Sequence, residues 1–253
     1  MPEFISWRSY SAFACSIIKD WRFIRSPEQN AYIDAVLSSS SSRVTSIPSG
    51  AQLWRAQQKH EWAVEIHEGQ EVDVLAPAKA ERMKPLRDQA VEGRANPKGI
   101  PYLYASTHKE TAIAEVRPWI GSLVTVAALT VLHPLKIVNC TSQAASSPLY
   151  FFEEPNAADR EAANWKAIDE AFSRPVTACE HSAEYAPTQV LAEAFRRNGF
   201  DGIAYRSSTL GVGHNIAIFN LDYAEIAHCT LSVIKSLQIV AEDENPNLKW
   251  TKK

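Results

Sequence analysis

The sequence predicts an α+β fold for a chain of 253 residues. Short strands rich in branched or aromatic residues are interspersed with amphipathic helices, without a strict strand–helix–strand rhythm and without an internal repeat. The composition is that of an ordinary globular protein, with 45% hydrophobic and 22% charged residues. We divide the chain into an N-terminal helical segment (1–45), a main domain (46–240) and a flexible, charged tail (241–253).

Two helices are expected in the N-terminal segment. Apolar and aromatic residues recur at helical spacing over residues 4–24, which predicts a helix that packs them into the core: Trp7, Tyr10, Ala14, Ile17 and Trp21. Residues 28–37 are expected to form the second helix. The serine run at 38–42 then predicts a flexible connector, which we interpret as a hinge to the main domain. A turn at 47–50 leads into a short strand at 52–57.

The next predicted helix carries an acidic residue beside its apolar face. A strand with an aromatic face is expected at 100–105, and Thr107 and Glu110 form a capping box directly after it. Pro118 ends this helix, and Glu115 lies at the border of its apolar face. The elements expected later are strands at 124–131 and 135–140, a loop at 141–156, a helix at 157–173 with Trp165, Ile168 and Phe172 inward, a helix at 187–198 closed by Gly199, and strands at 202–205 and 215–219.

Glycine is scarce, and its spacing excludes two common nucleotide sites. None of the nine glycines completes G-x-G-x-x-G or G-x-x-x-x-G-K-[ST], so a nucleotide would have to be held by side chains. Between Lys79 and Lys98 six basic residues stand against three acidic ones. This stretch could bind an anion of modest size or could be a solvated basic surface.

Charge, cysteine spacing and hydropathy restrict the function and location. A net charge of −3 argues against binding nucleic acid through many phosphates. Four scattered cysteines predict core thiols, and His60, Glu61 and His67 miss the zinc-binding H-E-x-x-H spacing, so we expect no metal. The longest apolar stretch, 123–132, is about half as long as a membrane helix. We therefore expect a cytoplasmic protein without a direct nucleic-acid or membrane partner.

Polar residues of four kinds stand at the edges of the expected elements. Arg55 ends one strand, Tyr104 ends the next, and residues 207–208 are serines that follow a late strand. Each of these is compatible with an ordinary surface or half-buried position. Glu115 is harder to explain, because a carboxylate beside an apolar face needs a partner. Arg117 or Arg55 could supply one in a purely structural ion pair.

Short motifs run through the main domain in a fixed order. They are LWRA at 53–56, GRANPKGIPYLY at 93–104, ETAIAEVRP at 110–118, YAPTQ at 185–189, GFDGIAYRS at 199–207 and NIAIF at 215–219. Together they resemble the RES domain family, which is named for an arginine, a glutamate and a serine, and the resemblance runs from about residue 45 to 222. Two features depart from the family pattern. Gln57 replaces a second arginine, and Ser207 competes with Ser208 for the serine; we favour Ser207 because it directly follows Tyr205 and Arg206.

The resemblance implies a fold similar to that of ADP-ribosyltransferase toxins and an activity that consumes NAD⁺ as a substrate, without a resident cofactor. It further implies a bacterial toxin, either of a toxin–antitoxin pair or an effector delivered into the cytoplasm of a target cell. The expected partner is an Xre-type antitoxin or an immunity protein, and we also consider a homodimer. The site residues are catalytic Glu115, Arg55 and Tyr104, and NAD⁺-binding Arg94, Ser207 and Asn215.

The chemistry suits these residue types. Breaking the bond between ribose C1′ and nicotinamide releases a neutral pyridine, so the demand falls on the oxocarbenium-like ribose, which the carboxylate of Glu115 would stabilise. Arg55 and Arg94 would hold the pyrophosphate with forked donors. Tyr104 would offer its ring to the nicotinamide, and Ser207 would orient the substrate by a hydrogen bond.

Three functions stay open on the sequence alone. The first is a toxin that degrades NAD⁺ by hydrolysis or phosphorolysis, and the second is a protein ADP-ribosyltransferase. The third is a catalytically silent module that binds NAD⁺ or a partner, for which Gln57 is the best support.

Overall fold

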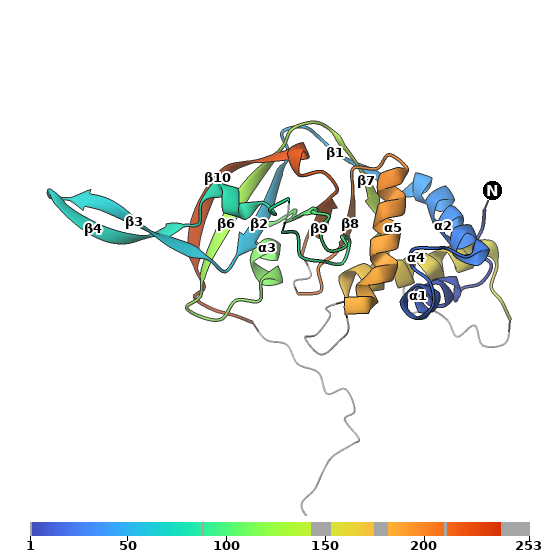
Figure 1. Cartoon of the computed structure of the whole chain (residues 1–253). Helices are drawn as coiled ribbons and strands as arrows, with labels where there is room; N and C mark the ends of the chain where they lie inside the picture. The colour runs from blue at the N-terminus through green and yellow to red at the C-terminus, as the bar shows by residue number, and fades with distance from the viewer. Residues whose placement is uncertain (1, 88, 143–152, 175–181, 210–211, 239–253) are drawn as a thin grey trace, which may run out of the picture.

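One eight-stranded sheet forms the centre of the computed structural model, which describes residues 2–87, 89–142, 153–174, 182–209 and 212–238 (Figure 1). The strand order is β1-β7-β8-β9-β5-β2-β6-β10, and every neighbouring pair is antiparallel except β7 and β8. The strands are β1 (Val44–Ile47), β2 (Gln52–Gln57), β3 (His60–His67), β4 (Gln70–Pro77), β5 (Leu103–Ser106), β6 (Leu123–Val131), β7 (Leu135–Asn139), β8 (Gly202–Arg206), β9 (His214–Ile218) and β10 (Ala224–Val233). The α-helices are α1 (Ser9–Lys19), α2 (Pro27–Ser40), α3 (Lys109–Glu115), α4 (Ala157–Ser173) and α5 (Ala186–Arg197).

The end of the molecule opposite the β3–β4 hairpin is formed by α1, α2, α4 and α5 (Figure 1). α1, α2, α4 and α5 gather beside β7 and β8, whereas the short helix α3 packs against β2, β5 and β6. α4 and α5 lie in the connection between the parallel strands β7 and β8. β3 and β4 pair only with each other among the described strands. A mainly antiparallel sheet with helices gathered at one end is an α+β architecture, so the predicted fold class is confirmed.

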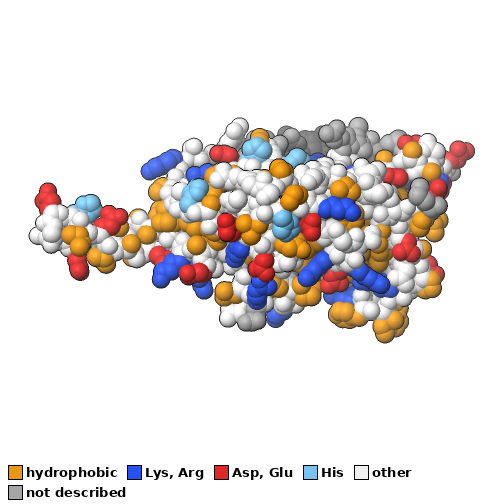
Figure 2. All heavy atoms as spheres, turned by 90° about the horizontal axis from the view of Figure 1, so that it is seen from above, with side chains coloured by type: hydrophobic (Ala, Val, Ile, Leu, Met, Phe, Trp, Pro, Cys, Tyr) orange, Lys and Arg blue, Asp and Glu red, His pale blue; other side chains and the backbone are white. Residues whose placement is uncertain are grey.

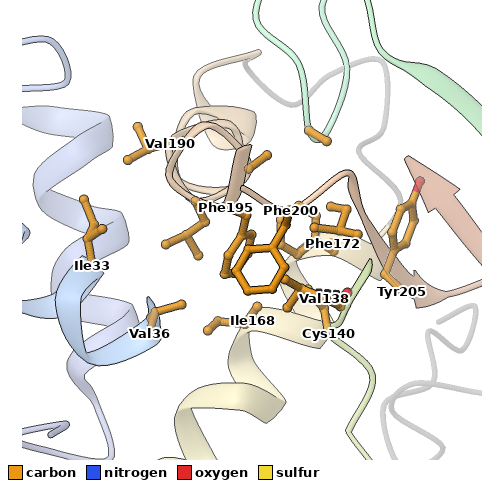
Figure 3. Close-up of a cluster of buried hydrophobic side chains, with 14 of the residues drawn as sticks. Ile33, Val36, Val138, Cys140, Ile168, Phe172, Val190, Phe195, Phe200 and Tyr205 are labelled. Carbon is orange, nitrogen blue, oxygen red and sulfur yellow. Dashed lines mark hydrogen bonds between the residues drawn. The ribbon is translucent and has the colours of Figure 1, made fainter. Parts of the chain in front are cut away.

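The main hydrophobic core joins all four of these helices to β7 and β8. Trp165, Ile168 and Phe172 of α4 are fully buried, as their spacing predicts. Ile33 and Val36 of α2 belong to the same cluster and point toward α4 and α5 (Figure 3). The N-terminal helices therefore share a core with the main domain.

The serine run at 38–42 is helical, which corrects the expectation of a flexible connector. α2 continues to Ser40 and passes into a 3₁₀ turn at Ser41–Arg43, after which β1 begins at once. The hydroxyls of the last four serines each donate to the carbonyl three residues earlier, at 2.7–3.1 Å. Serine side chains that bond to the backbone in this way satisfy the carbonyls at a helix end, so a composition typical of a linker here ends a helix.

α3 begins without the expected capping box. Its N-cap residue is His108, and no side chain caps it. Thr107 Oγ1 instead lies 2.9 Å from His108 Nδ1 and accepts a hydrogen bond from the backbone N–H of His214 at 2.9 Å. The threonine thus connects the end of β5 to the start of β9, while Pro118 follows the helix as predicted.

Other sequence predictions need smaller corrections. The first helix spans 11 residues rather than 4–24, which leaves Trp21 outside it and 63% exposed. Cys15 is exposed and is not a core thiol, whereas Cys140 is buried. Four strands were missed: β1, β3, β4 and β10. Three predictions lie outside the described residues, namely most of the loop at 141–156, the thiol of Cys179 and the tail at 241–253.

Candidate active site

Five of the six predicted site residues line one cleft of about 350 Å³, and the sixth, Ser207, reaches it through a hydrogen bond to Glu115. Arg55 comes from β2, Tyr104 from β5, Glu115 from the end of α3 and Asn215 from β9, while Arg94 lies in the loop before β5. β5 is placed between β2 and β9 in the sheet, so residues far apart in the sequence converge. The other lining residues are Trp54, Ala56, Gly93, Ala105, Ser106, Ala112, Val116, Tyr185 and Tyr205. The size is at the lower end of the range typical of small-molecule sites.

Glu115 is held by three side-chain donors. Its Oε1 accepts hydrogen bonds from Ser207 Oγ at 2.7 Å, Asn215 Nδ2 at 2.7 Å and Thr209 Oγ1 at 3.2 Å. Ser106 Oγ donates to Asn215 Oδ1 at 2.8 Å, which fixes the orientation of that amide. All three donors converge on one oxygen, and no hydrogen bond to Oε2 forms among the described residues. The carboxylate is therefore fixed in direction while one oxygen stays available to a ligand.

Arg55 is a half-buried cation whose Nε is buried and which has no acidic partner among the described residues. Its Nη1 donates to the carbonyl oxygen of Tyr104 at 2.8 Å, while its buried Nε has no hydrogen-bond partner in the described structure. None of the ion pairs between described residues includes Arg55, so the structural pair with Glu115 that the sequence left open does not form. Burial lowers the pKa of Arg55. A buried, charged donor without an acceptor is costly, and this arrangement favours an anionic ligand.

Tyr104 holds the loop before β5 against the sheet. Its hydroxyl donates to Asn96 Oδ1 at 2.8 Å and accepts from the backbone N–H of Ala95 at 2.9 Å. A Cβ at Gly93 would lie 2.7 Å from Tyr104 Oη, so glycine is needed at this close approach. Burial raises the pKa of Tyr104, and the hydroxyl therefore stays protonated at neutral pH. What Tyr104 offers to a ligand in the cleft is its ring.

The motif at 185–189 fastens the same loop from the other side. Thr188 Oγ1 donates to the carbonyl of Arg94 at 2.5 Å. Gln189 Nε2 donates to the carbonyls of Gly93 and Asn96, at 3.0 and 3.1 Å. Two motifs that are distant in sequence are thus parts of one hydrogen-bonded wall of the cleft.

Arg94 connects this wall to α4. Its Nη1 donates to the carbonyls of Phe172 and Ser173, at 2.9 and 3.1 Å, which satisfies two of the last carbonyls of the helix. Arg94 therefore has a structural role that the sequence did not predict. Its side chain also lines the cleft, and binding of NAD⁺ by its other donors stays a prediction.

The two serines at the end of β8 differ in their surroundings. Ser207 contacts Glu115, whereas Ser208 is exposed. The preceding residue, Arg206, donates through Nε to the fully buried carboxylate of Asp169 at 2.6 Å. This ion pair fixes the end of β8 and hence the point from which Ser207 reaches the carboxylate. The structure thus places the favoured serine at the site.

Sequence reasoning missed several residues of the site. Trp54 is the neighbour of Arg55 on β2, and strand alternation gave no reason to place both at one cleft. Thr209 and Ser106 contribute hydrogen bonds around Glu115, and their contacts with it or with Asn215 span about a hundred residues of sequence. Two tyrosines also line the cleft, Tyr185 and Tyr205. Both belong to motifs of the family resemblance, which was the one signal that could have found them.

A larger cavity of about 550 Å³ lies elsewhere, between α1, α2 and the chain before α1. Its walls are mostly apolar, and none of the predicted site residues lines it. No group of three or more His, Cys, Asp and Glu side chains in the described ranges could hold a metal ion. Across the same ranges, every helix is too short or too polar to cross a membrane. The cleft around Glu115 is therefore the candidate active site.

A family model described as the RES domain matches residues 52–237, from the start of β2 to beyond the end of β10. The chain belongs to the RES domain family. All of the predicted site residues of this RES protein lie within the matched range. Among solved structures, a chain in the crystal structure of the M. tuberculosis MbcT–MbcA toxin–antitoxin complex is similar, with 12% identity and a TM-score of 0.46; the match covers 78% of this chain and 92% of that chain. No curated protein matches the sequence.

Proposed function

We propose that this RES protein degrades NAD⁺ by breaking the bond between ribose C1′ and the nicotinamide nitrogen. The observation that carries the proposal is the pair of groups in one cleft: Glu115, held by three donors, and Arg55, a cation with a buried Nε and no acidic partner among the described residues. NAD⁺ complements both, because its pyrophosphate is anionic and its ribose becomes cationic as the bond breaks. The same pair would suit neither a neutral substrate nor a purely structural role.

Glu115 would act on the charge that develops at the ribose. When the bond breaks, both of its electrons go to the nicotinamide nitrogen, which becomes neutral, and the positive charge moves to C1′ and the ring oxygen. A carboxylate fixed by Ser207 and Asn215 stabilises that charge more in the transition state than in the ground state. An oxygen of water or phosphate then bonds to C1′ and releases a proton. The products are nicotinamide with ADP-ribose or its 1-phosphate.

The remaining residues of the cleft would bind and orient the dinucleotide. Arg55 would donate to the pyrophosphate through Nε, which finds no acceptor within the described structure. Arg94 would add donors that α4 does not use. Tyr104 and Trp54 give the cleft aromatic side chains suited to the flat pyridinium ring of nicotinamide.

We further propose that the chain acts as a toxin that a partner protein, such as an Xre-type antitoxin, neutralises. Membership of the RES family supports this proposal. Expression of the chain without a partner should stop growth as cellular NAD⁺ falls, and expression of the Glu115→Gln variant should not. Growth arrest with unchanged NAD⁺ would contradict the link between toxicity and this site.

The activity is tested with purified protein and NAD⁺, with and without inorganic phosphate, by chromatography of the nicotinamide released. Label transfer from NAD⁺ to a macromolecule would instead identify a protein ADP-ribosyltransferase. Binding without turnover would identify the silent module. The feature that favoured this last function, Gln57, pairs with Thr125 in the sheet and is not among the residues that line the cleft.

A further inference from the structure

The β3–β4 hairpin, residues 60–77, exposes an apolar row beside carboxylates. Trp62, Val64 and Ile66 alternate along β3 and therefore lie on one face, and all three are exposed, Trp62 at 65%. Opposite Val64 and Ile66 in the register are Asp73 and Glu71 of β4, which share this face. Figure 2 shows the projecting hairpin with hydrophobic and acidic side chains intermixed. Exposed apolar side chains that adjoin one another in this way mark an interaction site.

Among the described residues, the hairpin lacks a packing partner along most of its length, which an isolated pair of strands needs for stability. A two-stranded hairpin is marginally stable in water, and this one contacts the rest of the described structure mainly at its base, near β6 and β10. Between His60 and Pro77 the chain has five carboxylates and neither Lys nor Arg. A surface that covers the hairpin should therefore be apolar and basic.

A surface of that kind lies at the opposite end of the same chain. The segment 21–25 between α1 and α2 reads Trp-Arg-Phe-Ile-Arg, and Phe23 is 94% exposed. It adjoins the apolar cavity of about 550 Å³, because Gln29 lines that cavity and its Nε2 donates to the carbonyl of Trp21 at 3.0 Å. Ile5 and Arg8 stand at the same cavity. We call residues 3–9 and 21–26, together with the cavity, the N-terminal face.

The charges of the two surfaces are opposite. The N-terminal face carries Arg8, Arg22 and Arg25 against Glu3 and Glu28, whereas the hairpin carries five carboxylates and no basic residue. The Nε of Arg25 is buried and has no hydrogen-bond partner in the described structure. Both surfaces thus combine exposed apolar groups with unbalanced charge of opposite sign, which is the pattern of complementary interfaces.

We propose that the β3–β4 hairpin docks on the N-terminal face of a second copy of this chain. The hairpin and the N-terminal face lie at opposite ends of one molecule, so a hairpin cannot fold back onto its own N-terminal face (Figure 1). Each copy has one hairpin and one N-terminal face. When two copies dock reciprocally, every hairpin and every N-terminal face is covered, and the assembly closes as a dimer. Trp62 is the central contact, since exposed aromatic residues of this kind carry most of the binding energy in interfaces. This inference is independent of the proposed enzymatic function.

The test is the mass of the full chain in solution by light scattering after size-exclusion chromatography. At about 100 μM, far above the roughly micromolar dissociation constant of a modest specific interface, the wild-type chain should have twice its mass of 28.1 kDa. Trp62→Ser and the double variant Arg22→Glu with Arg25→Glu should each run as monomers. Val72→Ser, on the other face of the hairpin, is the matched control and should stay dimeric.

Mixing the variants makes the test specific. Trp62→Ser keeps an intact N-terminal face, and the double arginine variant keeps an intact hairpin, so an equimolar mixture should form a heterodimer through one contact. Circular dichroism checks that each variant is folded. A monomeric wild-type chain, a dimer that persists in Trp62→Ser, or a mixture that stays monomeric would each overturn the proposal.

Discussion

Replacing Arg55 with methionine should separate the binding role of this arginine from a structural one. The side chain is half-buried, and its Nε is buried and lacks an acceptor among the described residues. If the site exists to bind an anion, the empty protein holds a costly buried charge. Arg55→Met removes that charge and keeps most of the side-chain volume, so it should weaken NAD⁺ binding and stabilise the protein.

The two effects have different magnitudes. Two charge-assisted hydrogen bonds to a pyrophosphate are worth about 1.5–3 kcal/mol each, and losing both corresponds to a rise in KM of roughly 10²- to 10⁴-fold. Replacement of buried charged groups by apolar ones of similar size can stabilise a protein by about 1–4 kcal/mol. Loss of the hydrogen bond from Arg55 Nη1 to the Tyr104 carbonyl, about 1 kcal/mol, reduces that gain. The net gain of about 0–3 kcal/mol corresponds to a rise in Tm of up to about 12 °C.

The assay combines thermal unfolding without ligand and steady-state release of nicotinamide. Arg87→Met is a suitable control, because Arg87 is exposed and pairs with Asp222 on the surface at 2.7 Å. That variant should change stability by less than about 1 kcal/mol and leave KM unchanged. A lower Tm for Arg55→Met, together with an unchanged KM, would show that Arg55 is structural and refute the reasoning.

Three further predictions concern the carboxylate, the serines and alkaline stability. Glu115→Gln keeps an acceptor for the neighbouring donors but removes the charge, so the rate of nicotinamide release should fall by roughly 10²-fold or more. The control Glu110→Gln, at the exposed start of α3, should leave that rate unchanged. A fall of less than tenfold for Glu115→Gln would contradict the electrostatic role. Ser207→Ala should reduce kcat by about tenfold through loss of one hydrogen bond to the carboxylate, and Ser208→Ala should not; equal effects on kcat would show that the contact is unimportant. Burial raises the pKa of the Cys140 thiol above the value of about 8.5 for an unfolded chain. Above about pH 9 the unfolded state therefore loses the thiol proton while the folded state keeps it. The free energy of unfolding should fall as the pH rises further. Thermal unfolding from pH 7 to 11 measures this, and Cys140→Ala should reduce the slope; identical slopes would count against it.

The sequence predicted the elements whose signal is local. The helix at 157–173 was predicted with the bounds that the structure shows, because Trp165, Ile168 and Phe172 recur at helical spacing and are all fully buried. The short strand at 52–57 was also correct. In both cases one buried face produces a periodic pattern of apolar residues, which can be recognised without knowledge of the neighbouring elements.

The hairpin at 60–77 could not be recognised as easily, since both of its strands are largely exposed and carry charges among the apolar residues. The serines at 38–42 were misread because composition alone does not distinguish a flexible run from hydroxyls that bond back to a helix end. The capping box at Thr107 failed for a related reason. The hydroxyl that a cap requires bonds to the backbone of His214, about a hundred residues away.

The sequence predicted which residues form the candidate site but not which contacts they make. Arg55 and Glu115 were singled out by their places at the edges of expected elements, and the family resemblance selected Ser207; in the structure Arg55 and Glu115 line one cleft and Ser207 donates to Glu115. The absence of an acidic partner for Arg55 among the described residues and the structural role of Arg94 toward α4 depend on the packing of distant segments. Neither leaves a local pattern in the sequence.

The central claim is tested most directly by measuring nicotinamide released from NAD⁺ by the purified full chain, beside the Glu115→Gln variant. We expect the wild-type chain to release one nicotinamide for each NAD⁺ lost, with water or with phosphate as acceptor, and the variant to be slower by roughly 10²-fold or more. Intact NAD⁺ after incubation of the wild-type chain both with and without phosphate would contradict it.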